Sequence, residues 1–112
     1  MMPSVNNASA FKNSAVGSHT STAAETTLTS VVVSFPGNSS AVPRKIRVSG
    51  SVSGYVQVQV SANKYINIAC NPNSPYTEEA FDSSAFSGPV TALTIGFQCD
   101  AVGTIRAIVY GN

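Results

Sequence analysis

Residues 55–70 read YVQVQVSANKYINIAC, and this stretch decides the expected fold. In residues 55–60, valine alternates with tyrosine or glutamine, which is the period of an extended strand with one buried and one solvated face. A short polar connection follows, after which Ile66, Ile68 and Cys70 recur at every second position. The stretch therefore predicts an antiparallel β-hairpin.

The same period of two appears on both sides of this hairpin. It is seen at residues 26–35 and 44–48 upstream, and at residues 91–97 and 105–109 downstream. Turn-forming residues end the first of these stretches at residues 36–40, PGNSS. Six strands at this spacing predict an all-β domain: a single antiparallel β-sandwich of about six or seven strands, jelly-roll-like or immunoglobulin-like.

The composition agrees with a sandwich and excludes several kinds of site. Valine and isoleucine together number 20 against two leucines, and 17 serines and 9 threonines supply polar surface in place of charges. Only 11 of the 112 residues are charged, and the net charge is +1. One histidine, two cysteines and no basic run are too few for a His-rich metal site, a four-cysteine zinc site or a nucleic-acid-binding face. The sequence therefore predicts no metal, no cofactor and no nucleic-acid partner.

The N-terminal residues lack this period. Their large apolar side chains are two methionines, Val5, Phe11 and Val16. Fixing a backbone costs about 1 to 2 kcal/mol per residue, whereas burying one such side chain returns only about 1.5 to 3 kcal/mol. We therefore expect residues 1–25 to form an extended N-terminal arm that a neighbouring molecule orders, and residues 26–112 to form the sandwich. In the alternative, the arm lies along its own domain as an extra strand.

The chain carries no recognisable signal for export or for a membrane. Its N-terminus has no basic segment followed by an apolar stretch, and its longest apolar run is Val31-Val32-Val33, far short of the roughly 18 residues of a membrane span. We expect no membrane partner, and either a chain that is made and kept in the cytosol or one that reaches the outside by another route, such as release inside an assembled particle. Cys70 and Cys99 each end a predicted strand, so a disulfide is conceivable, but two free thiols are expected without export.

The titratable residues do not form a predicted catalytic site. His19, the single imidazole, lies in the arm, where nothing is expected to hold it beside a nucleophile, so it is interpreted as an exposed or interface residue. Glu78, Glu79 and Asp82 follow Thr77 and are expected to cap one helical turn, with a calcium site as the alternative. Neighbours on one turn cannot face each other across a cleft, as glycoside hydrolysis requires. No catalytic residue is predicted, and the protein is not expected to be an enzyme.

One basic cluster and two loop aromatics are candidates for contact with a partner. Alternation places Lys45 and Arg47 on the same outward face, next to Arg44, where they could hold an acidic protein surface, an anionic glycan or a phosphate. Protection of a sheet edge is the alternative role of these cations. Tyr76, Phe81 and Phe86 lie in a long loop, where they cover the core, dock on a partner or stack on a sugar, and Tyr76 and Phe86 are the two expected to contact a partner.

The outer face of the central hairpin is a further candidate surface. Tyr55, Gln57 and Gln59 share this face with Asn67, and none of these residues is charged. Such a face suits a protein neighbour or a polysaccharide, or is merely hydrated.

Three features together resemble the small virion proteins of bacteriophages, in particular head decoration or cement proteins. They are the arm rich in Ser, Thr and Asn, the uncharged strands of Val, Thr and Gln, and the abrupt end TIRAIVYGN at residues 104–112. The resemblance implies a jelly-roll-like or other β-sandwich that binds the outside of an assembled capsid as a homo-oligomer, a trimer above all, and stabilises the shell. It implies the virion as location and the major capsid protein, or another virion protein, as partner, and it assigns no functional residues.

The expected function is that of a non-enzymatic viral structural protein, a capsid decoration or cement protein that binds an assembled phage head through its arm and sandwich edges. The alternative is a carbohydrate- or receptor-binding module of a phage fibre or spike, with a glycan as partner. The residues expected to contact the partner are Val5, Phe11, Val16, Arg44, Lys45, Arg47, Tyr76 and Phe86.

Overall fold

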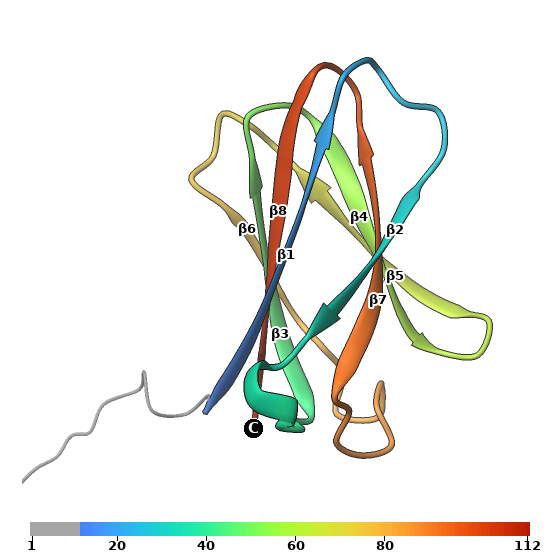
Figure 1. Ribbon diagram of the computed structural model, residues 1–112, viewed down its shortest axis with the longest axis vertical. Coiled ribbons are helices and arrows are strands. Elements are labelled where there is room, and N and C mark those ends of the chain that lie inside the picture. Colours follow the sequence, from blue (N-terminus) through green and yellow to red (C-terminus); the bar gives the residue numbers. More distant parts are fainter. Residues whose placement is uncertain (1–11) are drawn as a thin grey trace, which may run out of the picture.

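The computed structural model describes residues 12–112 and arranges them as two antiparallel β-sheets that face each other (Figure 1). The strands are β1 (Asn13–Ser21), β2 (Thr29–Ser34), β3 (Pro43–Gly50), β4 (Gly54–Ser61), β5 (Lys64–Cys70), β6 (Thr77–Ala80), β7 (Ala92–Cys99) and β8 (Gly103–Gly111). A short 3-10 turn, Pro36–Asn38, lies between β2 and β3, and within residues 12–112 no helix is long and apolar enough to cross a membrane. The prediction of an all-β fold with antiparallel sheets is confirmed, with eight strands in place of six or seven.

The strands pair in a nested order. β4 pairs with β5, β3 with β6, β2 with β7 and β1 with β8, all antiparallel. The chain is thus a long double strand folded at the β4–β5 turn, and its successive pairs lie alternately in the two sheets. Because β8 also pairs with β3 and β7 with β4, sheet A has the order β1-β8-β3-β6 and sheet B the order β2-β7-β4-β5.

The hairpin predicted from residues 55–70 is present as β4 and β5. Its register joins Gly54 to Cys70 at the open end. Asn63 in the turn has a φ of 62°, a left-handed conformation that asparagine adopts more readily than most residues. Val56 and Val58 are fully buried, so the period of two identifies the inward face correctly.

The core lies between the two sheets. Its side chains come from alternate residues of the strands, so that the apolar face of each sheet meets that of the other. Fully buried members include Ile46, Val48, Val56, Val58, Ile95, Phe97, Ile105 and Val109. Burying each such side chain stabilises the fold by about 1.5 to 3 kcal/mol, and this shared core holds both outer faces in place.

β1 corrects the expected boundary between arm and sandwich. Residues 1–25 are expected as an arm, yet β1 pairs with β8 along its full length of nine residues. Three of its inward residues, Ala15, Gly17 and Ser21, are small, and the space at Gly17 is narrow: a β-carbon there would lie 2.5 Å from a methyl carbon of Val33. Backbone pairing, which needs no large apolar side chain, orders this strand. Val5 and Phe11 lie outside the described residues.

β6, at Thr77–Ala80, lies where a helical turn over residues 77–82 is expected. It pairs with β3, with Glu78 opposite Arg47, and forms the edge of sheet A. β6 supplies hydrogen-bond partners to backbone groups of β3 that would otherwise be unpaired. The local sequence around residues 77–80 does not reveal that β3 needs this partner strand. Because β3 is an inner strand, sheet-edge protection is wrong as the role of Lys45 and Arg47.

Cys70 and Cys99 are free and buried, as expected. They end β5 and β7, and both pair with Gly54 of β4 from opposite sides. Two interstrand steps of roughly 4.5 to 5.5 Å each place their α-carbons beyond the roughly 7 Å that a disulfide spans. Burial raises the pKa of the Cys70 thiol, with the neighbouring Cys99 as the smaller cause.

Candidate functional site

The outer face of sheet A brings together side chains from four strands. Directly paired residues of neighbouring strands share a face, so the registers define rows across this sheet. One row is Ser14, Tyr110, Lys45 and Ala80, and the next row is Val16, Ile108, Arg47 and Glu78. We call these two rows, together with Tyr76 just before β6, the sheet A face.

Arg47 lies at the centre of the sheet A face. Its Nε and Nη2 donate hydrogen bonds to Oε2 of Glu78 at 3.0 and 2.8 Å. Its guanidinium carbon lies 4.1 Å from the ring centroid of Tyr76 and 5.6 Å from that of Tyr110. A guanidinium close to an aromatic face is attracted by the ring quadrupole. These contacts fix the orientation of a long side chain that would otherwise sample many rotamers.

Two cations on this face share one carboxylate. Lys45 Nζ lies 3.5 Å from Glu78 Oε2 and 5.4 Å from the ring centroid of Tyr110. The hydrogen bonds from Arg47 hold the pKa of Glu78 below its ordinary value, and Lys45 adds to this effect, while the bond to Glu78 raises the pKa of Arg47. One carboxylate cannot balance two cations, and exposed Arg106 lies one row further along β8. The sheet A face is therefore positively charged.

Apolar and aromatic side chains surround these cations. Val16 is 51% exposed and pairs with Ile108, and Tyr76 is 46% exposed beside Arg47. Tyrosine and arginine next to aliphatic residues are typical of the centre of protein–protein interfaces. A flat face with this composition suits contact with another macromolecule whose surface is acidic.

Four of the residues expected to contact a partner meet on the sheet A face. They are Val16, Lys45, Arg47 and Tyr76, which come from β1, β3 and the segment before β6. Their convergence depends on β8 lying between β1 and β3, which the sequence does not reveal. Sequence reasoning does not single out Tyr110, although the alternation of the last predicted strand is the signal that places it on the outer face.

Arg44 and Phe86 lie elsewhere. Arg44 occupies a bulge at the start of β3, where the register with β8 shifts, and its carbonyl accepts a hydrogen bond from the N–H of Phe81 at 2.8 Å. Phe86 lies edge-on to Phe81, with ring centroids 5.3 Å apart, and lines a shallow pocket of about 280 Å³ with Val60 and Leu93. Phe81 is buried, so these loop aromatics cover part of the core, which is one of the two roles expected for them.

The outer face of sheet B has a different chemistry. We call the sheet B face the outward residues Val32, Tyr55, Gln57, Gln59, Tyr65, Asn67 and Thr94. β2, β4 and β7 contain no charged residue, and Val32 is 69% exposed. This face offers amide, hydroxyl and aromatic groups and no ionic attraction.

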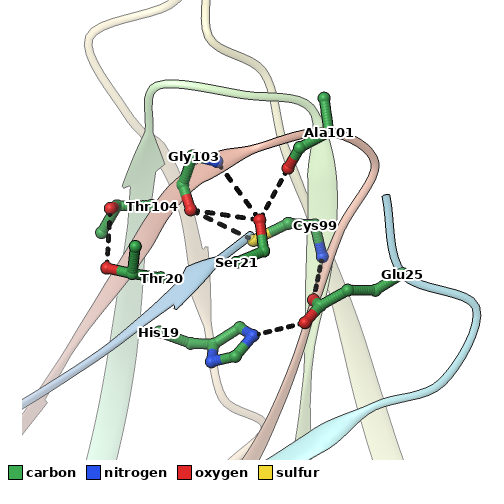
Figure 2. Close-up of polar contacts among 8 residues, drawn as sticks. All are labelled: His19, Thr20, Ser21, Glu25, Cys99, Ala101, Gly103 and Thr104. Carbon is green, nitrogen blue, oxygen red and sulfur yellow. Dashed lines mark hydrogen bonds and ion pairs between the residues drawn. The ribbon is translucent and has the colours of Figure 1, made fainter. Parts of the chain in front are cut away.

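His19 is held more firmly than the sequence predicts. It lies in β1, and its Nε2 is 2.7 Å from Oε2 of Glu25 (Figure 2). The other carboxylate oxygen, Oε1, accepts a hydrogen bond from the backbone N–H of Cys99 at 2.9 Å. The bond from Cys99, and then the bond with His19, keep the pKa of Glu25 below its ordinary value. The structure corrects the expectation that nothing holds this imidazole.

The acidic residues considered as a calcium site diverge. Glu78 and Glu79 are successive residues of β6, so their side chains point to opposite faces of the strand. Asp82 accepts hydrogen bonds from the backbone N–H and the hydroxyl of Ser84 at 2.9 and 2.8 Å, and these bonds lower its pKa. The three carboxylates therefore do not meet around a cation.

Comparison of the chain with protein-family models, with curated proteins and with solved structures finds no match in any of the three. The function is therefore inferred from the strand order and from the residues that the fold places side by side. Among the surfaces described, the sheet A face combines the largest number of side-chain types that contribute strongly to binding.

Proposed function

We propose that the protein is a non-enzymatic structural component of a virus particle, of the capsid decoration or cement type, that binds an acidic protein surface through the sheet A face. The observation that carries this proposal is the convergence of Val16, Arg47 and Tyr76, from three separate segments, around a cluster with excess positive charge. The partner in this proposal is the major capsid protein or another virion protein.

The strand order supports the proposal at the level of fold. A double strand that wraps into β1-β8-β3-β6 and β2-β7-β4-β5 has the connectivity of an eight-stranded jelly roll. Viral capsid domains and lectin domains both use this architecture, so the fold agrees with the resemblance to virion proteins without deciding between these roles. The chemistry of the outer faces has to make that distinction.

Repetition by symmetry would make a modest contact strong. Arginine and tyrosine dominate the binding energy of many interfaces, but a single exposed cation contributes little when salt screens it. A homo-oligomer, a trimer in the first instance, would present several sheet A faces to a symmetric shell and gain affinity through multivalency. Residues 1–11, with Val5 and Phe11, are proposed as a further anchor to the same shell.

Co-sedimentation tests this proposal directly. Full-length protein is mixed with purified heads of the phage that encodes it, and the bound fraction is measured for the wild type, Arg47→Ala and Gln57→Ala. We expect Arg47→Ala to lower the affinity at least roughly tenfold and Gln57→Ala, on the sheet B face, to leave it unchanged. Failure of the wild type to sediment with the heads, or equal binding by Arg47→Ala, would contradict the proposal.

A carbohydrate- or receptor-binding role is the second candidate, and the sheet B face favours it. Gln57, Gln59 and Asn67 can donate and accept hydrogen bonds, and Tyr55 and Tyr65 offer rings for sugar stacking. A glycan array separates the two candidates. Saturable binding that Gln57→Ala removes and Arg47→Ala retains would support this second role, and an array without any signal would count against it.

A further inference from the structure

We propose that His19, Glu25 and Cys99 form a binding site for one zinc ion, at the end of the sandwich where β1, β7 and the β1–β2 connection meet (Figure 2). This site lies apart from the sheet A face and does not depend on the proposed function. The sequence predicts no metal. It does not reveal this site because the three donor residues come from three separate segments of the chain.

The fold brings the three residues together in a defined way. His19 is on the inward side of β1, in alternation with Gly17 and Ser21, while Cys99 is the last residue of β7. Glu25 lies between β1 and β2, and its backbone N–H donates a hydrogen bond to the carbonyl of Cys99 at 2.9 Å. With the reverse bond from the N–H of Cys99 to Oε1 of Glu25, the glutamate is attached to β7 at two points.

The distances between the donor atoms fit a zinc centre after a small adjustment. One donor atom of each residue lies within 4.8 Å of the other two, and the imidazole and carboxylate are 2.7 Å apart. Around tetrahedral zinc, with bonds of about 2.0 to 2.3 Å, such atoms are roughly 3.3 to 3.6 Å apart. Side-chain shifts of about 1 Å therefore suffice. The His19–Glu25 bond would open as both groups turn to the metal.

The donor set selects zinc over the alkaline-earth cations. Imidazole nitrogen, carboxylate oxygen and thiolate sulfur are the three ligand types that zinc accepts, whereas calcium and magnesium require oxygen ligands throughout. Three protein ligands leave the fourth position of the tetrahedron to a water molecule. Zinc binds cysteine as the thiolate, so a proton leaves the sulfur to solvent when the metal binds.

Neighbouring groups already hold the ligands in place. The backbone N–H of Cys99 orients the Glu25 carboxylate, as an outer hydrogen bond does in established zinc sites. The Cys99 sulfur is fully buried, and its contact with the carbonyl of Gly103, at 3.9 Å, is a weak one that a metal could replace. Ser21 bonds to the carbonyl of Ala101 at 2.7 Å and fixes the adjoining turn (Figure 2).

A zinc ion at this position would join the two sheets. β1 belongs to sheet A and β7 to sheet B, so one ion would link them and also hold the β1–β2 connection. Small domains with a limited core often gain stability from a structural metal. At a hundredfold excess of free zinc over its Kd, we expect the Tm to rise by roughly 10 °C.

Metal titration of the reduced full-length protein tests the site. Zinc is titrated by calorimetry, and cobalt(II) serves as a spectroscopic probe because a thiolate ligand gives it an intense charge-transfer band. We expect one metal per chain, a cobalt–thiolate band and a higher Tm. Cys99→Ser should remove the band and weaken zinc binding by roughly a hundredfold or more, and His19→Gln should weaken it at least roughly tenfold.

Cys70→Ser is the matched control, because Cys70 is also buried, ends a strand and pairs with Gly54. It should keep the band and the affinity, as should Arg47→Ala, whose weaker binding to phage heads is a separate expectation. If Cys99→Ser does not fold, His19→Gln and Glu25→Gln at partly exposed positions provide the same comparison. Absence of stoichiometric binding, or a band that survives in the variants of all three ligands, would overturn the proposal.

Discussion

The two outer faces of the sandwich share one backbone plan and differ in chemistry. On both, every second residue of a strand points outward. The sheet A face carries Lys45, Arg47 and Glu78 beside Tyr76, whereas β2, β4 and β7 present no charged residue on the sheet B face. This difference shows that packing in the core restricts the identity of the inward residues only. The outward residues can therefore differ in chemistry, and serve in binding, without loss of the fold.

The two faces should also respond differently to solution conditions. Charged groups such as those on the sheet A face act over about one Debye length, roughly 8 Å at physiological ionic strength. The amide and hydroxyl groups of the sheet B face act only in direct contact. Three changes can therefore distinguish the two sheets in their contributions to stability and binding: truncation of the chain, added salt and acid. We expect truncation to have the largest effect and acid the smallest.

Removal of β1 should have the largest effect, because it breaks sheet A and leaves sheet B complete. Deleting residues 1–25 strips β8 of one of its two partner strands along nine residues and removes the two bonds that attach Glu25 to Cys99. We expect the cooperative unfolding transition to be lost in circular dichroism. Deleting residues 1–11 should keep the Tm within roughly 4 °C, since this change leaves all of β1, which begins at Asn13, in place. If the protein without residues 1–25 still unfolds cooperatively, the boundary between arm and sandwich at residue 25, as predicted from the sequence, would be supported.

Added salt should weaken binding at the sheet A face more than at the sheet B face. With a poly-glutamate peptide as probe, we expect amide resonances of Lys45, Arg47 and Tyr110 to shift in NMR spectra, and those of Gln57 and Asn67 to stay unchanged. Raising the salt from about 0.05 M to about 0.5 M should lower the affinity at least tenfold, because the cations are exposed to screening. Shifts spread equally over both faces would show that the charge difference does not direct binding.

Acid should produce the smallest of the three effects on the sheet A face, through Glu78. The pKa of Glu78 lies below its ordinary value of 4.5, so its ionised form stabilises the fold above that value, and this contribution is lost as the pH falls through the lower folded pKa. Arg47→Gln should raise the pKa of Glu78 toward its ordinary value in a carbon-13 NMR titration. Below about pH 4.5, Glu78→Gln should lose less stability than the wild type in thermal melts. An unchanged Glu78 titration in Arg47→Gln would contradict the cause assigned here.

Local patterns identified the faces of the strands but not their neighbours. The hairpin of β4 and β5 and the outward direction of Lys45 and Arg47 follow from a period of two, which is a property of one strand. The position of β3 between β8 and β6 follows from contacts far apart in the sequence, and it decides that these cations meet Glu78 and Tyr110. β6 was missed because its pairing with β3 outweighs a weak local preference for a helical turn.

The sequence by itself determined that the chain forms antiparallel strands with a Val/Ile core, because burial of alternate residues is encoded residue by residue. Only the tertiary structure decided which strands are neighbours, that a strand of small residues completes sheet A, and that His19 lies beside Glu25 and Cys99. The physical reason is that backbone pairing is almost independent of side-chain identity. Which strand pairs with which depends on how the whole chain packs around its core. No single segment of the sequence specifies that packing.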